Sequence, residues 1–436
     1  MKSPITQAFF HFSFAALLAA ASFALLPADA QSPAASPNGI WTGFAQQNGQ
    51  QVPFRLEISG TGDQVQSALI NGNEKSGKGK QKSPSSSGSY TDGHLVLHFD
   101  YYANTLDATI KDGVLTGTFG REGRQTPITA SLGDDPPAPS PNPPNIAGVW
   151  EVNVQGPKGE KAWKLQVLQT GANVEAVIQR IDGDTGALYG TWRDGQFAIS
   201  HFTAGGPAYD VLKPQADGTL QLETFGRGGQ VQLYAARRPQ EARAAGLVAP
   251  EDPMQHTVLQ NPSTPLALRF PDLNGKLVSN TDPQFQHKAV IVSIGGSWCP
   301  NCQDEAPFLE SLYQKYHSRG LEIVELSFEE SAQLANPARL RAVIQKYGIT
   351  YTVLVAGTPD QLNEKITGVS NLNCWPTTFF VGQDGLVKAI HTGYSGPATG
   401  KDNAELEHET TALVQKLLAG GSPSKPAGAN QVARAQ

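Results

Sequence analysis

Two segments of this sequence carry the same three landmarks in the same order. In the first segment the landmarks are GIWTGF at Gly39, GSYTDGHLVLHF at Gly88 and DGVLTGTFGREG at Asp112. In the second they are GVWEVN at Gly148, GTWRDGQFAISHF at Gly190 and DGTLQLETFGRGG at Asp217. Such matched order and spacing predict an internal duplication, with one repeat over residues 39–133 and the other over residues 147–237.

Each repeat is predicted to be a small antiparallel β domain, either a sandwich or a barrel. Apolar and polar residues alternate, as in HLVLHFDY, where Leu95 and Leu97 fall on one face. Asp-Gly pairs such as Asp92-Gly93 are strong hairpin signals. Neither repeat shows a catalytic motif, so we expect binding, docking or spacing from them. Trp41 and Trp150 could stack on a ligand, but core packing is the expected role.

The ends of the chain and the segments between domains have their own composition. The predicted segments are a cleaved signal peptide (1–30), a Pro-rich linker (134–146), a second linker (238–262) and a disordered tail (421–436). Cleavage near Ala30 predicts an extracytoplasmic, periplasmic protein. If the signal stays uncleaved, it would instead anchor the chain in the membrane. The net charge of −6 gives no indication of a nucleic-acid partner.

From residue 263 to residue 420 the pattern changes to alternating strands and helices. AVIVSI (289–294) and LEIVELSF (321–328) are predicted buried strands, each followed by a helical pattern. A hairpin turning at Asp384-Gly385 and an amphipathic helix close the segment. The chain is therefore predicted to be multidomain, with two duplicated β domains followed by an α/β domain with a mixed sheet.

Two of the three cysteines, Cys299 and Cys302, lie in SWCPNC directly after the first buried strand. Pro300 suits the first position of a helix, which places Cys299 at the N-cap, where the helix end favours a thiolate. Cys302, one turn further in, is expected to be more buried and to act as the resolving thiol. A zinc site would need more ligands, and a structural staple would close only a small loop, so redox exchange is favoured.

These motifs resemble the thioredoxin superfamily, and within it the TlpA/ResA-like extracytoplasmic thiol–disulfide oxidoreductases. SWCPNC after a buried strand and WPTTFFVGQDG further on carry the resemblance over about residues 263–420. It implies that Cys299 and Cys302 are the redox pair and that Trp298 is the aromatic residue before it, which is expected to contact the substrate. It also implies that Pro307 kinks the active-site helix and that Pro376 is a cis-proline that helps to bind the partner's backbone.

Three further residues have open roles. By the resemblance Glu305 is an acid near the pair that could take the proton of Cys302; the alternative is a solvated glutamate in the first turn. Cys374 departs from the family pattern and is expected to be a buried thiol, although it could exchange with the pair or bond another chain. Trp375 either shapes the substrate groove or only packs, and Asp304 is expected to be structural.

The resulting expectation is an exported enzyme that exchanges disulfides with other exported thiol or disulfide proteins, working as a reductant. It needs no cofactor or metal, but it needs a membrane electron donor. One alternative is a peroxiredoxin-like thiol peroxidase on the same fold, although a Thr-x-x-Cys pattern is missing. The other is a binding or scaffold protein whose β repeats recognise a partner.

Overall fold

The computed structural model describes residues 36–72, 80–133 and 138–420. The predicted signal peptide and the predicted disordered tail lie outside the described residues. Residues 36–420, where described, belong to one compact unit. Within the described residues, no helix is both long and apolar enough to cross a membrane.

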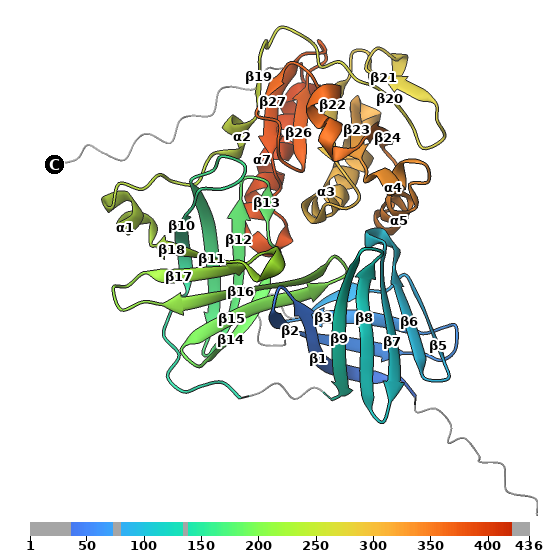
Figure 1. The fold of residues 1–436 in the computed structure, drawn as a ribbon. Coiled ribbons are helices and arrows are strands. Elements are labelled where there is room, and N and C mark those ends of the chain that lie inside the picture. Colours follow the sequence, from blue (N-terminus) through green and yellow to red (C-terminus); the bar gives the residue numbers. More distant parts are fainter. Residues whose placement is uncertain (1–35, 73–79, 134–137, 421–436) are drawn as a thin grey trace, which may run out of the picture. The chain divides into compact units, whose positions relative to one another are not determined.

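The first β region is an antiparallel meander of nine strands (Figure 1). Its strands are β1 (Gly39–Gln47), β2 (Gln50–Ser59), β3 (Gln66–Asn71), β4 (Gln81–Pro84), β5 (Ser87–Thr91), β6 (His94–Phe99), β7 (Asn104–Lys111), β8 (Val114–Arg121) and β9 (Arg124–Leu132). Their order in the sheet is β4-β3-β2-β1-β9-β8-β7-β6-β5, so β1 pairs with both β2 and the last strand. Leu95 and Leu97 are buried, as the alternation predicted.

The second β region also has nine strands, and its sheet closes on itself. Its strands are β10 (Gly148–Asn153), β11 (Ala162–Thr170), β12 (Asn173–Arg180), β13 (Gly183–Asp184), β14 (Leu188–Arg193), β15 (Gln196–Thr203), β16 (Gly206–Pro214), β17 (Leu220–Phe225) and β18 (Val231–Arg237). The order is β11-β10-β18-β17-β16-β15-β14-β12-β13, and an additional pairing of β11 with β12 completes a ring. Here too the first strand, β10, pairs with the second and the last.

The predicted Asp-Gly turns lie between paired strands. Asp92-Gly93 joins β5 to β6, and both residues have positive φ, of 50° and 83°. That combination is typical of the type I′ turn, whose twist suits a two-residue hairpin. Trp41 and Trp150 are 2% and 5% exposed, so both are core residues and neither is free to stack on a ligand.

The segment predicted as the second linker contains regular structure. Its elements are α1 (Pro239–Ala244), α2 (Pro253–His256) and β19 (Val258–Leu259). β19 pairs with β25 (Val369–Ser370), close to the predicted cis-proline loop. The segment therefore packs against the C-terminal region over part of its length.

The C-terminal region has a five-stranded mixed sheet with helices around it. The principal elements are β22 (Ala289–Gly295), α3 (Pro300–Tyr316), β23 (Leu321–Phe328), α5 (Ala338–Tyr347), β24 (Thr352–Gly357), β26 (Thr377–Val381), β27 (Val387–Thr392) and α7 (Lys401–Leu418). The sheet order is β24-β23-β22-β26-β27. β22, β23 and β24 are parallel to one another, and β26 is antiparallel to both of its neighbours, β22 and β27. This order, with a helix after each of the first two strands, is a thioredoxin-like arrangement, as the sequence predicted.

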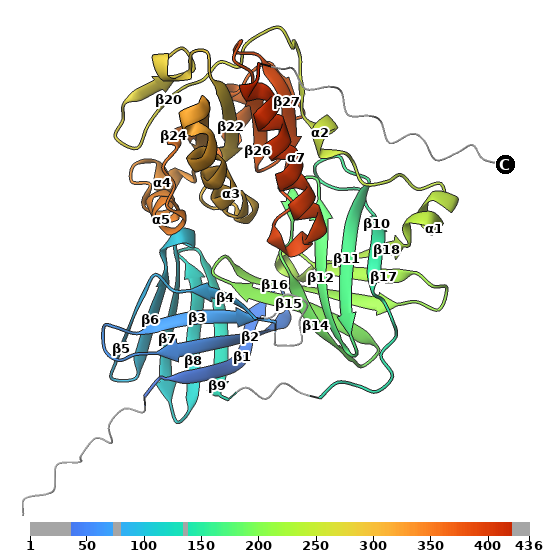
Figure 2. The same ribbon diagram turned by 180° about the vertical axis from the view of Figure 1, so that it is seen from behind.

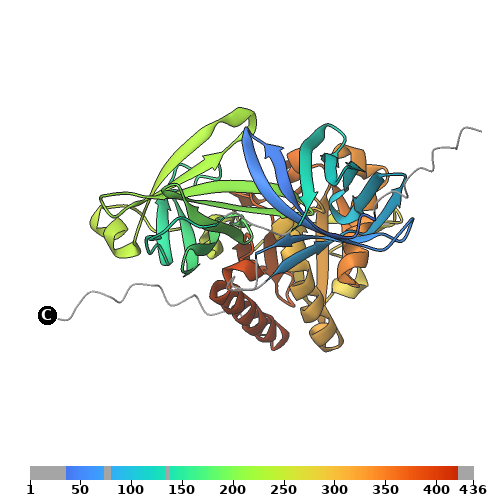
Figure 3. The ribbon, with the colours of Figure 1, turned by 90° about the horizontal axis from the view of Figure 1, so that it is seen from below.

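Helices α3, α5 and α7 share one apolar cluster with the sheet. Leu309, Leu340 and Val414 of these helices belong to the same buried cluster as Ile291 and Ile323 of the central strands. Figures 2 and 3 show α3 and α7 side by side along the sheet. α3 is therefore held rigidly, and its N-terminus is fixed at the carboxyl end of β22.

The other face of the sheet is covered by shorter elements. These are β20 (Arg269–Pro271), β21 (Leu277–Ser279), α6 (Leu362–Lys365) and the chain around Phe285, with α4 (Ser331–Leu334) in the loop that follows β23. Phe270, Phe285 and Leu362 pack there with Val292 of β22. Because both faces are covered, β22 is buried along its whole length.

Candidate redox site

The two cysteines of the WCPNC motif form a disulfide at the start of α3. β22 ends at Gly295, and Cys299 is the N-cap residue of the helix, with Pro300 in its first turn. The backbone N–H of Cys302 donates a hydrogen bond to Cys299 Sγ over 3.1 Å. The predicted strand-to-helix position is confirmed. An N–H donor and the positive end of the helix both favour a thiolate at Cys299 once the disulfide is reduced.

The exposure of the two cysteines is the reverse of what we expected from the sequence. Cys299 is only 3% exposed, whereas Cys302 is partly exposed. The expectation considered α3 alone, but the helix start has a neighbour from the second β region. The Asn301 side-chain amide, between the two cysteines, donates to the Asp182 carbonyl oxygen over 3.1 Å. The prediction that Cys302 is the more buried cysteine was therefore wrong.

The loop before β26 provides the second wall of the site. The Trp375–Pro376 peptide bond is cis, as the resemblance implied. The Pro376 carbonyl oxygen accepts a hydrogen bond from Gly393 N over 2.7 Å, which ties this loop to the end of β27. The Trp375 ring packs edge-on against Trp298, with 5.4 Å between ring centroids, and against Phe328. The two predicted substrate-groove tryptophans thus contact each other beside the redox pair.

Glu305 is buried one turn after Cys302. It is 6% exposed and accepts hydrogen bonds from Ser293 Oγ (2.9 Å) and Thr378 Oγ1 (2.7 Å). Burial raises the pKa of Glu305 to about 7, although the two hydroxyl donors lower it in part. The alternative of a solvated first-turn glutamate is excluded by this environment. Pro307, two residues later, lies inside α3 at an exposed position.

A second glutamate near Cys302 was missed by the sequence analysis. A Cβ built on Gly295 would lie 3.3 Å from Cys302 Sγ and 3.9 Å from Glu325 Oε1, so both groups border this glycine. Burial raises the pKa of Glu325 to about 7, helped by the negative charges of Glu329 and Glu305. The available signal was weak: LEIVELSF has two glutamates, Glu322 and Glu325, within a mostly apolar strand.

Asp304 was expected to be structural, and it faces a second carboxyl group. A Cβ built on Gly396 would lie 2.9 Å from Asp304 Oδ2 and 3.0 Å from Asp184 Oδ2, on the second β region. Burial, and then the charge of Asp184, raise the pKa of Asp304 to about 7. Both carboxyl groups line a cavity at the start of α3.

Cys374 is a fully buried free thiol. Its Sγ lies 3.1 Å from Asn373 Oδ1 and 3.7 Å from His256 Nε2. Burial, and then the charge of Asp182, raise the pKa of Cys374 to about 12. A protonated, buried thiol is a poor nucleophile, which agrees with the expected buried thiol.

A buried ion pair holds the turn between β22 and α3. The side chain of Glu329 accepts hydrogen bonds from the backbone N–H and the hydroxyl of Ser297, at 2.7 and 2.6 Å. Arg339 Nη2 donates to Glu329 over 3.0 Å, and both side chains are at most 1% exposed. This network fixes the backbone directly before Trp298 and Cys299.

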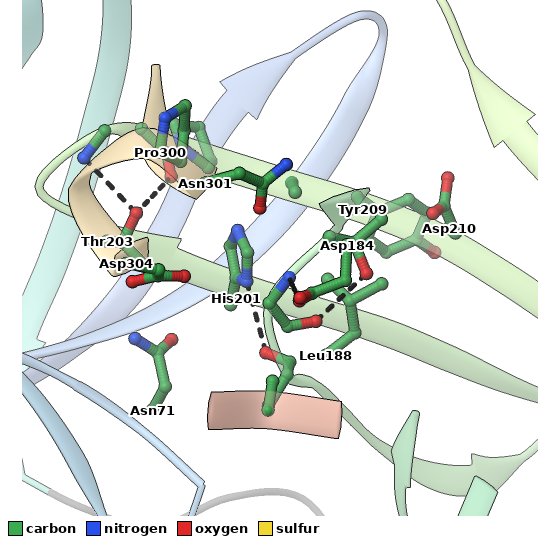
Figure 4. Close-up of a pocket in the computed structure, with 18 of the residues that line it drawn as sticks. Asn71, Asp184, Leu188, His201, Thr203, Tyr209, Asp210, Pro300, Asn301 and Asp304 are labelled. Atoms are coloured by element: carbon green, nitrogen blue, oxygen red, sulfur yellow. Dashed lines mark hydrogen bonds between the residues drawn. The ribbon is translucent and has the colours of Figure 1, made fainter. Parts of the chain in front are cut away.

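A cavity of about 1100 Å³ borders the start of α3. Figure 4 shows side chains from α3 and from both β regions around it. Those that border it include Asn71, Asp184, His201, Asp210, Asn301 and Asp304. Burial lowers the pKa of His201 and raises that of Asp210 to about 6, so burial shifts each of these two groups towards its neutral form. No group of three or more His, Cys, Asp or Glu side chains placed to hold a metal ion occurs in the described part of the chain.

Comparison with known proteins agrees with this geometry. The AhpC/TSA family model matches residues 263–390. The thiol-disulfide oxidoreductase ResA of Bacillus anthracis is 29% identical over 116 residues, which are 27% of this chain and 60% of that protein. The C-terminal region is similar to ResA. ResA of Geobacillus thermodenitrificans is 30% identical over 28% of this chain and 63% of its own length.

The region similar to ResA is only part of this chain. The chain in turn spans about 60% of the length of the curated relatives that it matches. Among solved structures, a thiol:disulfide interchange protein of the thioredoxin family from Chlorobium tepidum matches 36% of this chain and 97% of its own. Its sequence identity is 22% and its TM-score is 0.27.

Proposed function

We propose that this protein is a thiol–disulfide oxidoreductase that exchanges disulfides with other exported proteins through Cys299 and Cys302. The observation that carries the proposal is the disulfide at the N-terminus of α3, beside the cis-Pro376 loop. The similarity of the C-terminal region to proteins named thiol-disulfide oxidoreductase supports it. A thiolate at a helix N-terminus is both a nucleophile and a good leaving group, which disulfide exchange requires.

In the reducing direction the Cys299 thiolate attacks one sulfur of a substrate disulfide. A bond forms between Cys299 and that sulfur, and the other substrate sulfur leaves as a thiolate. Cys302 then attacks the Cys299 sulfur, which forms the enzyme disulfide and releases the second substrate thiolate. The substrate gains two electrons and its two thiolates take up two protons, while the enzyme pair is oxidised.

Glu305 and Glu325 are suited to handle the proton of Cys302. Cys302 must lose its proton before it can attack, and an acceptor with a pKa near the working pH is the most effective. Burial brings the pKa of both carboxyl groups to about 7. We assign Glu325 to this step together with Glu305, because its oxygen borders the same glycine as Cys302 Sγ.

The partners follow from the chemistry. After each turnover the enzyme holds a disulfide, so a reductant needs an electron donor, and we propose a membrane protein for that role. Export itself is proposed from the signal-like residues 1–30. Trp298, Trp375 and Pro376 form the surface against which a substrate backbone would lie.

The two β regions are proposed to be duplicated domains. The sequence landmarks that match fall on corresponding strands: β1 with β10, β5 and β6 with β14 and β15, and β8 with β17. The indole N–H of Trp41 donates to the carbonyl four residues earlier, Pro37, and Trp150 does the same to Ile146. A shared strand order and a shared tryptophan contact support descent from one unit.

The test is turnover with a model disulfide. The wild type should reduce insulin when a dithiol regenerates it, whereas Cys299→Ser should lose the activity because no attacking thiolate remains. Cys374→Ser is the matched control and should keep the wild-type rate. A Cys299→Ser protein with the normal rate would overturn the proposal.

A further inference from the structure

The tip of the hairpin between β12 and β13 lies against the start of α3. The Asn301 side chain donates to the Asp182 carbonyl oxygen over 3.1 Å. A Cβ built on Gly183 would lie only 2.3 Å from Asn301 Nδ2 and 2.9 Å from the Tyr394 carbonyl oxygen. The contact is therefore close enough that only glycine fits at this position of the tip.

The same tip covers the residues next to the cis-proline. A Cβ built on Gly393 would lie 2.4 Å from the Ile181 carbonyl oxygen and 2.7 Å from Gly183 N. Gly393 in turn donates its backbone N–H to the Pro376 carbonyl oxygen. Backbone thus packs directly on backbone at the surface that we assign to the substrate.

Further contacts hold the second β region at both sides of this surface. Asp184 Oδ2 accepts a hydrogen bond from Gly396 N over 2.6 Å. In the loop between β10 and β11, the Lys158 ammonium donates to the carbonyl oxygen of Asn373, three residues before Pro376. Cys299 itself is 3% exposed.

We propose that the β12–β13 hairpin is a specificity-determining gate that decides which partners reach Cys299. This inference rests on the proposed function of the Cys299–Cys302 pair. A protein partner has to lay its backbone along the Pro376 loop and must displace the tip, whereas a small dithiol needs less room. The step that the gate controls is reduction of the Cys299–Cys302 disulfide. In it a dithiol gives two electrons and two protons to this disulfide and becomes a disulfide itself.

The contacts and the surroundings allow the tip to move. It is held by a few polar hydrogen bonds, whose groups can bond to water when the tip leaves. The cavity of about 1100 Å³ borders Asp182, Asp184 and Asn301, which leaves space beside the hairpin.

The experiment compares Gly183→Val with Gly206→Val in the full chain. Both glycines have φ of 122°, but a Cβ at Gly206 meets nothing within 4 Å, so its variant carries the same backbone strain without the clash. The measured quantity is the rate constant for reduction of the Cys299–Cys302 disulfide, by dithiothreitol and by a reduced thioredoxin.

In Gly183→Val the rate constant with thioredoxin should rise about tenfold, as expected for the loss of one or two hydrogen bonds that hold the tip. The rate constant with dithiothreitol should rise much less, and Gly206→Val should match the wild type with both. An unchanged ratio of the two rate constants in Gly183→Val would overturn the gate.

A second variant keeps the test valid if Gly183→Val does not fold. Asp184→Ala removes the hydrogen bond to Gly396 and leaves Gly183 intact, and it should shift the ratio in the same direction. An unchanged ratio in a folded Asp184→Ala protein would also count against the gate. Because the readout is the protein's own disulfide, failure of insulin reduction would refute the proposed function without deciding the gate.

Discussion

Replacing Glu305 by glutamine should change how the stability of this protein depends on pH. The pKa of Glu305 is about 7 in the folded protein, against 4.5 for an exposed glutamate. Between these values the folded protein keeps a proton that the unfolded chain has lost. The free energy of unfolding therefore falls as the pH rises from about 4.5 to about 7, and the contribution of Glu305 stays at this lowered value at higher pH.

The size of the effect follows from the two pKa values. Ionising the buried carboxyl group costs about 3 kcal/mol more than ionising it in the unfolded chain. A glutamine pays no such cost, and its amide can bond to Ser293 and Thr378, because a hydroxyl both donates and accepts. Glu305→Gln should thus gain about 3 kcal/mol relative to the wild type between pH 4.5 and pH 8.

The assay is denaturant unfolding of the oxidised protein at several pH values and constant ionic strength. Glu405→Gln, which removes an exposed carboxylate of α7, is the matched control for the loss of one charge. A difference between Glu305→Gln and the wild type that stays constant from pH 4.5 to pH 8 would refute the reasoning. It would mean that the carboxyl group is solvated in the folded protein.

Four further predictions address the surroundings of the site. Arg339→Met should lower the free energy of unfolding by about 3–5 kcal/mol, because it leaves the charge of Glu329 buried without its partner. Glu330→Gln, at the partly exposed partner of Arg339, should cost at most about 1 kcal/mol in the same denaturation experiment. Asp304→Asn should gain stability over the wild type as the pH rises from about 4 towards 7, since the pKa of Asp304 is raised to about 7; a parallel pair of pH curves would contradict this. Cys374 should resist alkylation by iodoacetamide at pH 8 in the native oxidised protein and react once in denaturant, because it is buried and its pKa is about 12; rapid native labelling counted by mass spectrometry would contradict its burial.

The parts of the site that follow from local sequence were predictable. A buried strand followed by Cys-Pro places Cys299 at a helix N-cap, because proline suits the first turn of a helix. The apolar residues of β22 require that the strand lies in the core. The resemblance supplied the cis-proline at Pro376. The turn residues Asp92 and Gly93 likewise specify a hairpin through backbone conformations that few residues adopt.

The parts that depend on long-range contacts were not predictable. The Asn301 side chain, between the two cysteines, donates a hydrogen bond to Asp182, 119 residues away, and no local pattern marks such a pair. Glu325 could have been suspected from its place in an apolar strand, but only the structure brings it to Gly295 beside Cys302. The carboxyl pair of Asp304 and Asp184 arises in the same way, from two regions that the sequence analysis treated separately.

The central claim is that Cys299 is the attacking thiol, and trapping the mixed disulfide tests it most directly. In Cys302→Ser, the Cys299 thiolate should attack a disulfide-bonded peptide, bond to one of its sulfurs and release the other, and the adduct should persist because no resolving thiol follows. Peptide mapping by mass spectrometry should find one peptide per chain, attached to Cys299. An adduct on Cys374, or none at all after reduction of the protein, would contradict the account.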